Sequence, residues 1–88
     1  MIKLTQKEIN KGMTFKIAEF NLLFLINDFE DTSISSIDPL KIGLNIGDTI
    51  EVVIPKKMMF GRRNAIVWTF KNKTYWSYWS VFKECVGS

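Results

Sequence analysis

The chain of 88 residues is long enough for one domain and no more, so we expect a single domain over residues 1–88. Seven Phe, three Trp and two Tyr supply a core, while one Cys and no His exclude an internal disulfide and a Cys/His metal site. The net charge of +3 is uneven, with +3 over residues 1–18, −6 over residues 19–51 and +6 over residues 52–88. This pattern predicts either separate acidic and basic surfaces or, if sheet pairing mixes distant segments, interleaved charges.

The N-terminal part of the chain predicts a short helix and a strand. Thr5 and Glu8 have capping-box spacing and Gly12 supplies a C-terminal stop, which predicts a helix from about Gln6 to Lys11. From Met13 to Ala18 apolar and polar residues alternate, as in a half-buried strand. The residues that we expect on its buried face are Met13, Phe15 and Ile17.

The middle of the chain is less regular. Within Phe20 to Phe29, the run Leu22 to Ile26 fits a buried strand or a helical turn, and the flanking turn residues favour the strand. Glu30 to Gly47 is polar and has Asp38 placed as an N-cap before Pro39. We therefore expect a long connection with one helical turn.

Period-two alternation returns in the second half of the chain. It predicts a strand over Thr49 to Ile54, with Ile50, Val52 and Ile54 on one face, and a strand over Ala65 to Phe70. In the second strand the shared face carries Ile66, Trp68 and Phe70.

A hairpin and a closing strand are expected after Phe70. Lys71 to Thr74 predicts a tight turn in which Asn72 tolerates positive φ, and the partner strand begins at Thr74. Ser77 to Phe82 predicts a single 3₁₀ turn, followed by a closing strand over Lys83 to Val86. In total, five to six short strands and a short N-terminal helix predict a mostly β (α+β) fold, either a small barrel or a strongly bent antiparallel sheet.

Three segments resemble the small SH3-like β-barrel proteins that tailed bacteriophages encode. They are Gly12 to Ile17, Gly47 to Val53, and Trp68 to Trp76 with its continuation to Phe82; the likeness covers about two thirds of the chain in patterning and turn residues. The resemblance implies an SH3-like barrel and a phage accessory protein. Such a protein inhibits or modulates a host protein, of defence or of nucleic-acid metabolism, or a phage protein, by stoichiometric binding.

A basic segment with bulky apolar residues lies between the two central strands, in Pro55 to Asn64. Its cations and its aromatic ring fit a nucleic-acid surface, where cations meet phosphates and the ring stacks on a base. They equally fit an acidic protein groove, where methionines adapt their shape and arginines bind carboxylates. A third possibility is two strand ends with solvated charges. The candidate residues are Lys56, Lys57, Met58, Met59, Phe60, Arg62 and Arg63.

The second candidate site is aromatic and consists of Tyr75, Trp76, Tyr78 and Trp79. Successive side chains of a strand point to opposite faces, so some of this aromatic area should lie outside the core. Exposed Trp and Tyr are enriched at interface hot spots. Alternatively, a 3₁₀ turn folds Tyr78 or Trp79 under the barrel as a plug.

No residue pattern in the chain indicates catalysis, a metal site or a cofactor. Asp28, Glu30 and Asp31 lack the spacing and the central Gly of a calcium loop, which favours a solvated surface. Cys85 lies in an apolar segment, where a packed thiol is commoner than a nucleophile. No phosphate-binding loop or nucleophile elbow accompanies any candidate base. We therefore expect a non-enzymatic binding module; a single-stranded nucleic-acid binder and an oligomeric protein that sequesters a small ligand are the alternatives.

The sequence also lacks a membrane signal. The longest apolar run, Leu22 to Ile26, is much shorter than the roughly 20 residues that cross a bilayer. Met1 to Lys16 lacks the apolar centre of a signal peptide. We expect a cytoplasmic protein, in the host cytoplasm if the chain is viral, with no membrane partner.

Overall fold

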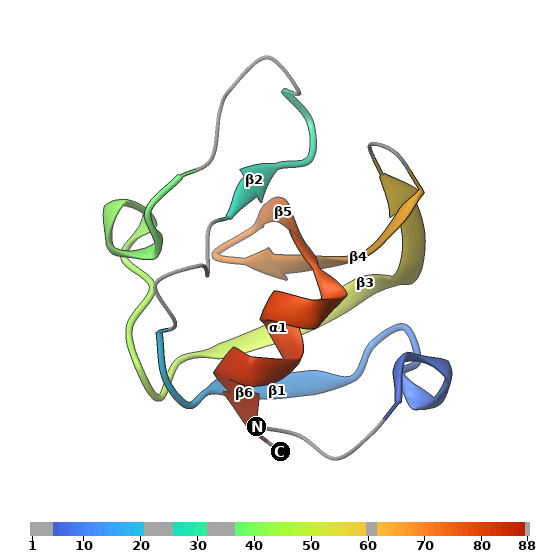
Figure 1. The fold of residues 1–88 in the computed structure, drawn as a ribbon. Helices are drawn as coiled ribbons and strands as arrows, with labels where there is room; N and C mark the ends of the chain where they lie inside the picture. The colour runs from blue at the N-terminus through green and yellow to red at the C-terminus, as the bar shows by residue number, and fades with distance from the viewer. Residues whose placement is uncertain (1–4, 21–25, 32–36, 60–61, 88) are drawn as a thin grey trace.

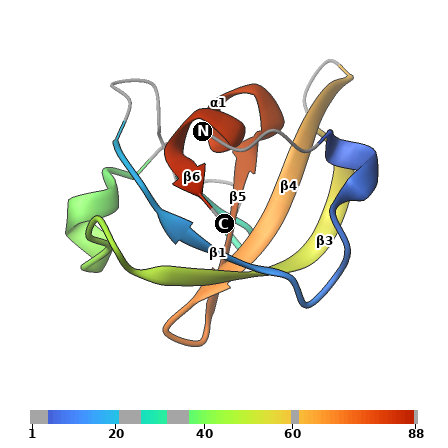
Figure 2. The ribbon, with the colours of Figure 1, turned by 90° about the horizontal axis from the view of Figure 1, so that it is seen from below.

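Six antiparallel strands form one sheet in the part of the chain that the computed structural model describes, residues 5–20, 26–31, 37–59 and 62–87 (Figure 1). The strand order is β2-β5-β4-β3-β1-β6. The sheet curves around the α-helix α1 (Figure 2). The elements are η1 (Gln6–Glu8, 3₁₀), β1 (Thr14–Ile17), β2 (Asn27–Asp28), η2 (Pro39–Ile42, 3₁₀), β3 (Thr49–Met59), β4 (Arg63–Phe70), β5 (Lys73–Tyr78), α1 (Trp79–Cys85) and β6 (Val86–Gly87).

The main core fills the concave side of the sheet beneath α1. Phe82 of α1 meets Phe15 of β1 edge to face, with ring centroids 5.9 Å apart. The Nε1 of Trp68 donates a hydrogen bond of 3.2 Å to the hydroxyl of Ser77, so the buried indole keeps a polar partner. The core residues are Ile9, Phe15, Ile17, Ile26, Leu44, Ile50, Val52, Ile66, Trp68, Phe70, Tyr75, Phe82, Cys85 and Val86.

The strand β4 is buried on both faces. Its residues from Ala65 to Trp68 are fully buried. Ile66 and Trp68 belong to the main core, whereas Ala65 and Val67 belong to a second cluster on the opposite face of the sheet. β4 therefore lies between two apolar layers, one on each face of the sheet. This explains why its sequence is nearly continuously apolar from Ala65 to Trp68.

The long strand β3 pairs with β4 through two register shifts. They lie between Val52 and Ile54 and between Ile54 and Lys57. Such irregularities bend a strand and leave backbone groups outside the regular ladder. The side chain of Gln6 supplies donors at this bend, since its Nε2 lies 3.0 Å from the carbonyl of Pro55 and 3.2 Å from that of Ala65.

Several local predictions are confirmed. Phe15 and Ile17 are buried on β1, and Ile66, Trp68 and Phe70 share the core face of β4. The carboxylate of Asp38 accepts from the Leu40 amide at 2.9 Å and caps η2 at Pro39. Lys71 and Asn72 both have positive φ, 52° and 65°, in a two-residue turn between β4 and β5.

Other predictions need correction. The N-terminal helix ends at Glu8 instead of Lys11, although the Glu8 carboxylate accepts from the Thr5 amide as the capping box predicts. β3 extends to Met59 instead of ending at Ile54, and the register shift places Ile54 against the second cluster instead of the main core. The predicted strand over Leu22 to Ile26 falls largely outside the described residues.

The prediction for the C-terminal segment is also wrong. Ser77 and Tyr78 of the predicted 3₁₀ turn belong to β5, and Trp79 to Cys85 form the helix α1. Of the predicted closing strand, only Val86 lies in a strand, the two-residue β6. Trp79, Phe82 and Cys85 stand three residues apart, and this spacing places them on one face of a helix that packs into the core. A strand would instead have placed Phe82 on the same face as the charged Glu84.

We expect Gln6→Glu to destabilise the fold by about 1–3 kcal/mol, because a carboxylate cannot donate to the carbonyls at the bend of β3. The free energy of unfolding in urea measures this. Lys7→Gln is the matched control, since it changes the net charge by the same amount at an exposed neighbouring position and should change stability by no more than about 0.5 kcal/mol. Equal effects of the two variants would contradict the role given to Gln6.

A second expectation concerns the turn between β4 and β5. Asn72→Val should cost about 1–2 kcal/mol because a β-branched residue is strained at positive φ, whereas Asn72→Gly should be better tolerated. Thermal and urea unfolding of the two variants provide the comparison. A Val variant as stable as the Gly variant would show that the turn does not require the left-handed conformation.

Candidate functional site

The outer face of the sheet, opposite α1, carries the second apolar cluster next to the β3–β4 hairpin. We call it the outer cluster: Ala65, Val67 and Trp76, with Phe29, Val53, Ile54 and Tyr78 packed against them. Cross-strand pairing arranges it in rows. One row is Ile54–Val67–Trp76, and the next is Lys57–Ala65–Tyr78. The second row begins with a cation, so the apolar cluster has a basic margin.

The Arg63 guanidinium covers the ring of Tyr78. Its central carbon lies 3.8 Å from the ring centroid. Arg63 stands two residues before Ala65 on β4, and Ala65 pairs with Tyr78 on β5, so the contact is a diagonal cross-strand pair. Tyr78 in turn meets Trp76 edge to face at 5.1 Å. An exposed arginine is thus anchored to a buried tryptophan through one ring.

An open pocket of about 240 Å³ lies beside this stack, where β5 ends and α1 begins. Trp79 forms an apolar wall, because its ring is half-buried and stacks on Phe82 with centroids 6.1 Å apart. Asn64 and Ser80 add an amide and a hydroxyl. The lining residues are Arg63, Asn64, Tyr78, Trp79 and Ser80.

The cations of the hairpin are exposed. We call Lys56, Lys57, Arg62 and Arg63 the basic tip. The ammonium of Lys57 lies 5.9 Å from the centroid of the Phe29 ring, at the margin of the outer cluster. In the part of the chain that the structure describes, no carboxylate lies within ion-pair distance of these four cations. Their charge is therefore available to a partner.

The structure brings together only part of the predicted site. Lys56, Lys57, Met58, Arg62 and Arg63 are exposed, and Met58 keeps 55% of its surface. Phe60 lies outside the described residues, and Met59 is described only as the last residue of β3. Of the aromatic residues, Tyr78 and Trp79 are half-buried, so the expectation of aromatic area outside the core holds for these two.

Tyr75 and Trp76 have little surface to offer. They are 4% and 3% exposed. Tyr75 packs against Trp68 in the main core, and Trp76 is the centre of the outer cluster. Both faces of the sheet are covered here, so alternation along β5 buries neighbouring rings instead of exposing every second one.

Sequence reasoning missed Asn64 and Ser80, which line the pocket. The signal lies in the pairing of β4 with β5: Ala65 lies opposite Tyr78, which brings the preceding Asn64 close to the residues that follow Tyr78. That register is visible only once the sheet is formed. It also depends on the position of the β4–β5 turn.

In comparisons with known proteins, no family model, no curated protein and no solved structure matches this chain.

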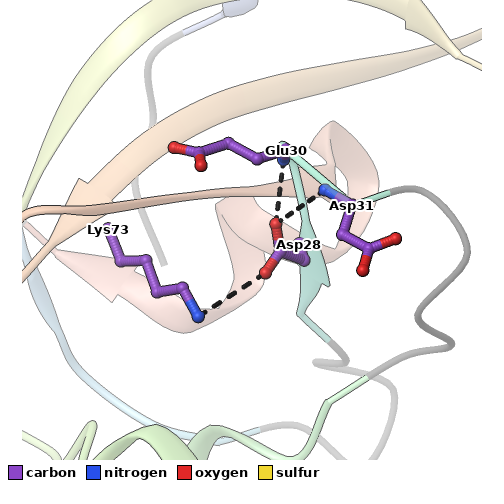
Figure 3. Close-up of polar contacts among 4 residues, drawn as sticks. All are labelled: Asp28, Glu30, Asp31 and Lys73. Atoms are coloured by element: carbon purple, nitrogen blue, oxygen red, sulfur yellow. Dashed lines mark hydrogen bonds and ion pairs between the residues drawn. The ribbon is translucent and has the colours of Figure 1, made fainter.

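The acidic segment that begins at the end of β2 is not wholly the solvated surface that the sequence predicted. Glu30 and Asp31 are exposed, but Asp28 is buried and has a structural role. The buried carboxylate of Asp28 accepts hydrogen bonds from the amides of Glu30 and Asp31, at 2.8 and 3.0 Å (Figure 3). Its second oxygen lies 3.7 Å from the ammonium of Lys73 in the β4–β5 hairpin. Asp28 therefore holds the chain in a turn against β5 and joins the acidic segment to the basic C-terminal part.

The described residues contain neither a metal-binding group nor a helix that could span a membrane. No group of three or more His, Cys, Asp or Glu among them is placed to hold a metal ion. None of their helices has the length and apolar character needed to cross a membrane. Cys85, predicted to be a packed thiol, is fully buried in the main core at the end of α1.

We expect Asp28→Ala to cost about 1–3 kcal/mol, because two amides lose their acceptor in a buried turn. Asp28→Asn keeps an acceptor oxygen and should cost less. Lys73→Ala should cost no more than about 1 kcal/mol, since the lysine is 61% exposed and solvent screens the ion pair. Urea unfolding of the three variants tests this order. A Lys73→Ala variant as unstable as Asp28→Ala would mean that the ion pair, and not the turn, is what matters.

Proposed function

We propose that this protein is a non-enzymatic binding module that occupies a surface of another protein in a stoichiometric complex. One observation supports the proposal most strongly: the basic tip lies beside the Arg63–Tyr78 stack and beside the pocket walled by Trp79, which we call the Trp79 pocket. Aromatic residues and arginine are the side chains most enriched at interface hot spots. The contact residues that we propose are Lys56, Lys57, Met58, Arg62, Arg63, Tyr78 and Trp79.

As part of the proposal, the fold is an SH3-like barrel. Leaving aside the short strand β2, the sheet order β6-β1-β3-β4-β5 runs from the C-terminal strand through the N-terminal strand to a meander of three long strands. The register shifts bend β3, and a bend of this kind is what an SH3-like barrel requires of a strand shared by its two halves. The helix α1, between the last two strands, covers the open side (Figure 2).

A protein partner is favoured over single-stranded nucleic acid by the state of the rings. Nucleic-acid surfaces stack successive bases on exposed aromatic faces. Among the described residues near the basic tip, Trp76 is buried, Tyr78 is covered by Arg63, and Trp79 is half-buried against Phe82. Trp79 is then the main ring with room for a base. Within the described ranges, four cations without a series of stacking faces suit a protein surface better.

The resemblance to phage-encoded SH3-like proteins supports a more specific proposal. In this proposal the chain is a phage accessory protein in the host cytoplasm, where it inhibits or modulates a protein of host defence or nucleic-acid metabolism. It would act by covering a surface of that protein. This mode of action requires no catalytic group.

The experiment is an affinity capture from nuclease-treated lysate of cells that naturally contain the protein, followed by native mass spectrometry of the complex. We expect a protein bound in fixed stoichiometry, and loss of that complex in the double variant Arg62→Glu with Arg63→Glu. The matched control is Lys16→Glu with Lys41→Glu, which changes the net charge equally at exposed positions on β1 and η2. It should retain the complex.

Three outcomes contradict the proposal. The first is a complex that survives in the Arg62, Arg63 double variant, because the basic tip is then not the contact surface. The second is binding to single-stranded DNA that weakens steeply between about 50 and 200 mM salt, with no protein captured. The third is a symmetric assembly of the chain alone, detected by light scattering, that the Arg62, Arg63 double variant disrupts. The basic tip would then be a contact between copies, which favours an oligomeric ligand-sequestering protein.

A further inference from the structure

The guanidinium of Arg63 is held in place before any partner arrives. It lies 3.8 Å from the Tyr78 ring, and Tyr78 rests against the buried Trp76. A stacked guanidinium has already lost much of its side-chain freedom, so binding through it costs less entropy than binding through a free side chain. Stacking occupies one face of the group and leaves the N–H groups at its edge for an acceptor.

The acceptor that suits this edge is a carboxylate. The planar fork of arginine matches two carboxylate oxygens, and hydrogen bonds of this kind are about twice as strong as neutral ones. The chain supplies no such group here, because no described carboxylate lies within ion-pair distance of Arg63. Lys56, Lys57 and Arg62 add three exposed cations along the same hairpin.

The size and lining of the adjacent pocket suit a small, partly apolar group such as one side chain. Its volume of about 240 Å³ lies below the roughly 300–1,000 Å³ of sites that hold drug-sized ligands, so it suits a side chain. Trp79 provides an apolar wall, and Asn64 and Ser80 provide neutral polar groups. A ligand that fits both parts has an acidic group next to an apolar side chain.

We infer that the basic tip and the Trp79 pocket bind an acidic peptide segment of the partner protein, with a carboxylate on Arg63 and a neighbouring apolar side chain against Trp79. This inference rests on the proposed function and specifies the chemistry of the partner. The other cations attract further acidic residues of the same segment and raise the rate of encounter.

The probe is a fluorescein-labelled synthetic peptide, acetyl-Glu-Glu-Leu-Glu-Phe-Glu-amide. Its matched control replaces every Glu by Gln and keeps Leu and Phe. Fluorescence anisotropy of both peptides, with the intact chain at fixed salt, gives the affinities. We expect the acidic peptide to bind and the glutamine peptide to bind at least tenfold more weakly.

Three variants locate the carboxylate. Arg63→Gln should weaken the acidic peptide about tenfold or more, and Arg63→Lys should weaken it by a smaller factor, because the lysine keeps the charge and loses the fork. Lys41→Gln is the control, since it removes the same charge from η2, at the side of the molecule away from the β3–β4 hairpin (Figures 1 and 2). It should change the affinity less than twofold. Near-ultraviolet circular dichroism checks that each variant is folded.

The inference is overturned if the two peptides bind equally, if Arg63→Gln and Lys41→Gln have the same effect, or if Arg63→Lys matches the unaltered chain. It is also overturned if a single-stranded oligothymidylate binds through Arg63 more tightly than the acidic peptide. These results leave the proposed function standing as long as a captured protein still depends on Arg62 and Arg63. If the captured protein does not depend on Arg62 and Arg63, both the proposed function and this inference are contradicted.

Discussion

The constraint on which the rest of this structure depends is the burial of β4 on both faces. A strand in this position needs apolar cover from two directions, and an 88-residue chain has little material for two layers. On one side α1 and β1 close the main core over Ile66 and Trp68. On the other side Trp76, Phe29 and Tyr78 cover Ala65 and Val67. The second cover is thin, and it is made mostly of aromatic rings because few residues must shield much area.

The thin outer layer determines where charge lies on the surface. Ala65 is small, so its neighbours in the row, Lys57 and Tyr78, come to the margin of the cluster. Arg63, one row further out, covers the ring that the layer leaves half-exposed. The acidic residue Asp28 lies at the other edge of β5, where it holds a turn and meets Lys73. The blocks of charge in the sequence are thus partly interleaved, while the basic tip stays without a described acidic partner.

The sequence predicted those features that depend on neighbouring residues. The alternation of Phe15 and Ile17, the Asp38–Pro39 cap and the positive φ of Asn72 are local consequences of side-chain chemistry. The two-layer burial was not visible, because β3 changes register against β4 and moves Ile54 from the expected face. Two-residue periodicity assumes a regular strand, and a bulge breaks it.

The candidate site shows the same division. Its cations could be chosen from the sequence, because a charged segment between two apolar strands is exposed in most folds. The aromatic rings that lie beside these cations could not be chosen from the sequence. Tyr75 and Trp76 are both buried, on opposite faces of β5. The pairing of Ala65 with Tyr78 brings Arg63 and Asn64 next to Trp79, and this pairing is not visible in the sequence. Likewise, the helix α1 forms where a turn and a strand were expected, because three spaced apolar residues needed one buried face.

The most direct test of the account is the proton NMR spectrum of the two neighbouring arginines in the free protein. If Arg63 is held on Tyr78, the ring current shifts its side-chain methylene signals upfield, away from those of the exposed Arg62, and Tyr78→Leu removes this difference. If the signals of Arg63 coincide with those of Arg62, or are unchanged in Tyr78→Leu, then Arg63 is not anchored to the outer cluster, and the structural basis for a prearranged binding surface is lost.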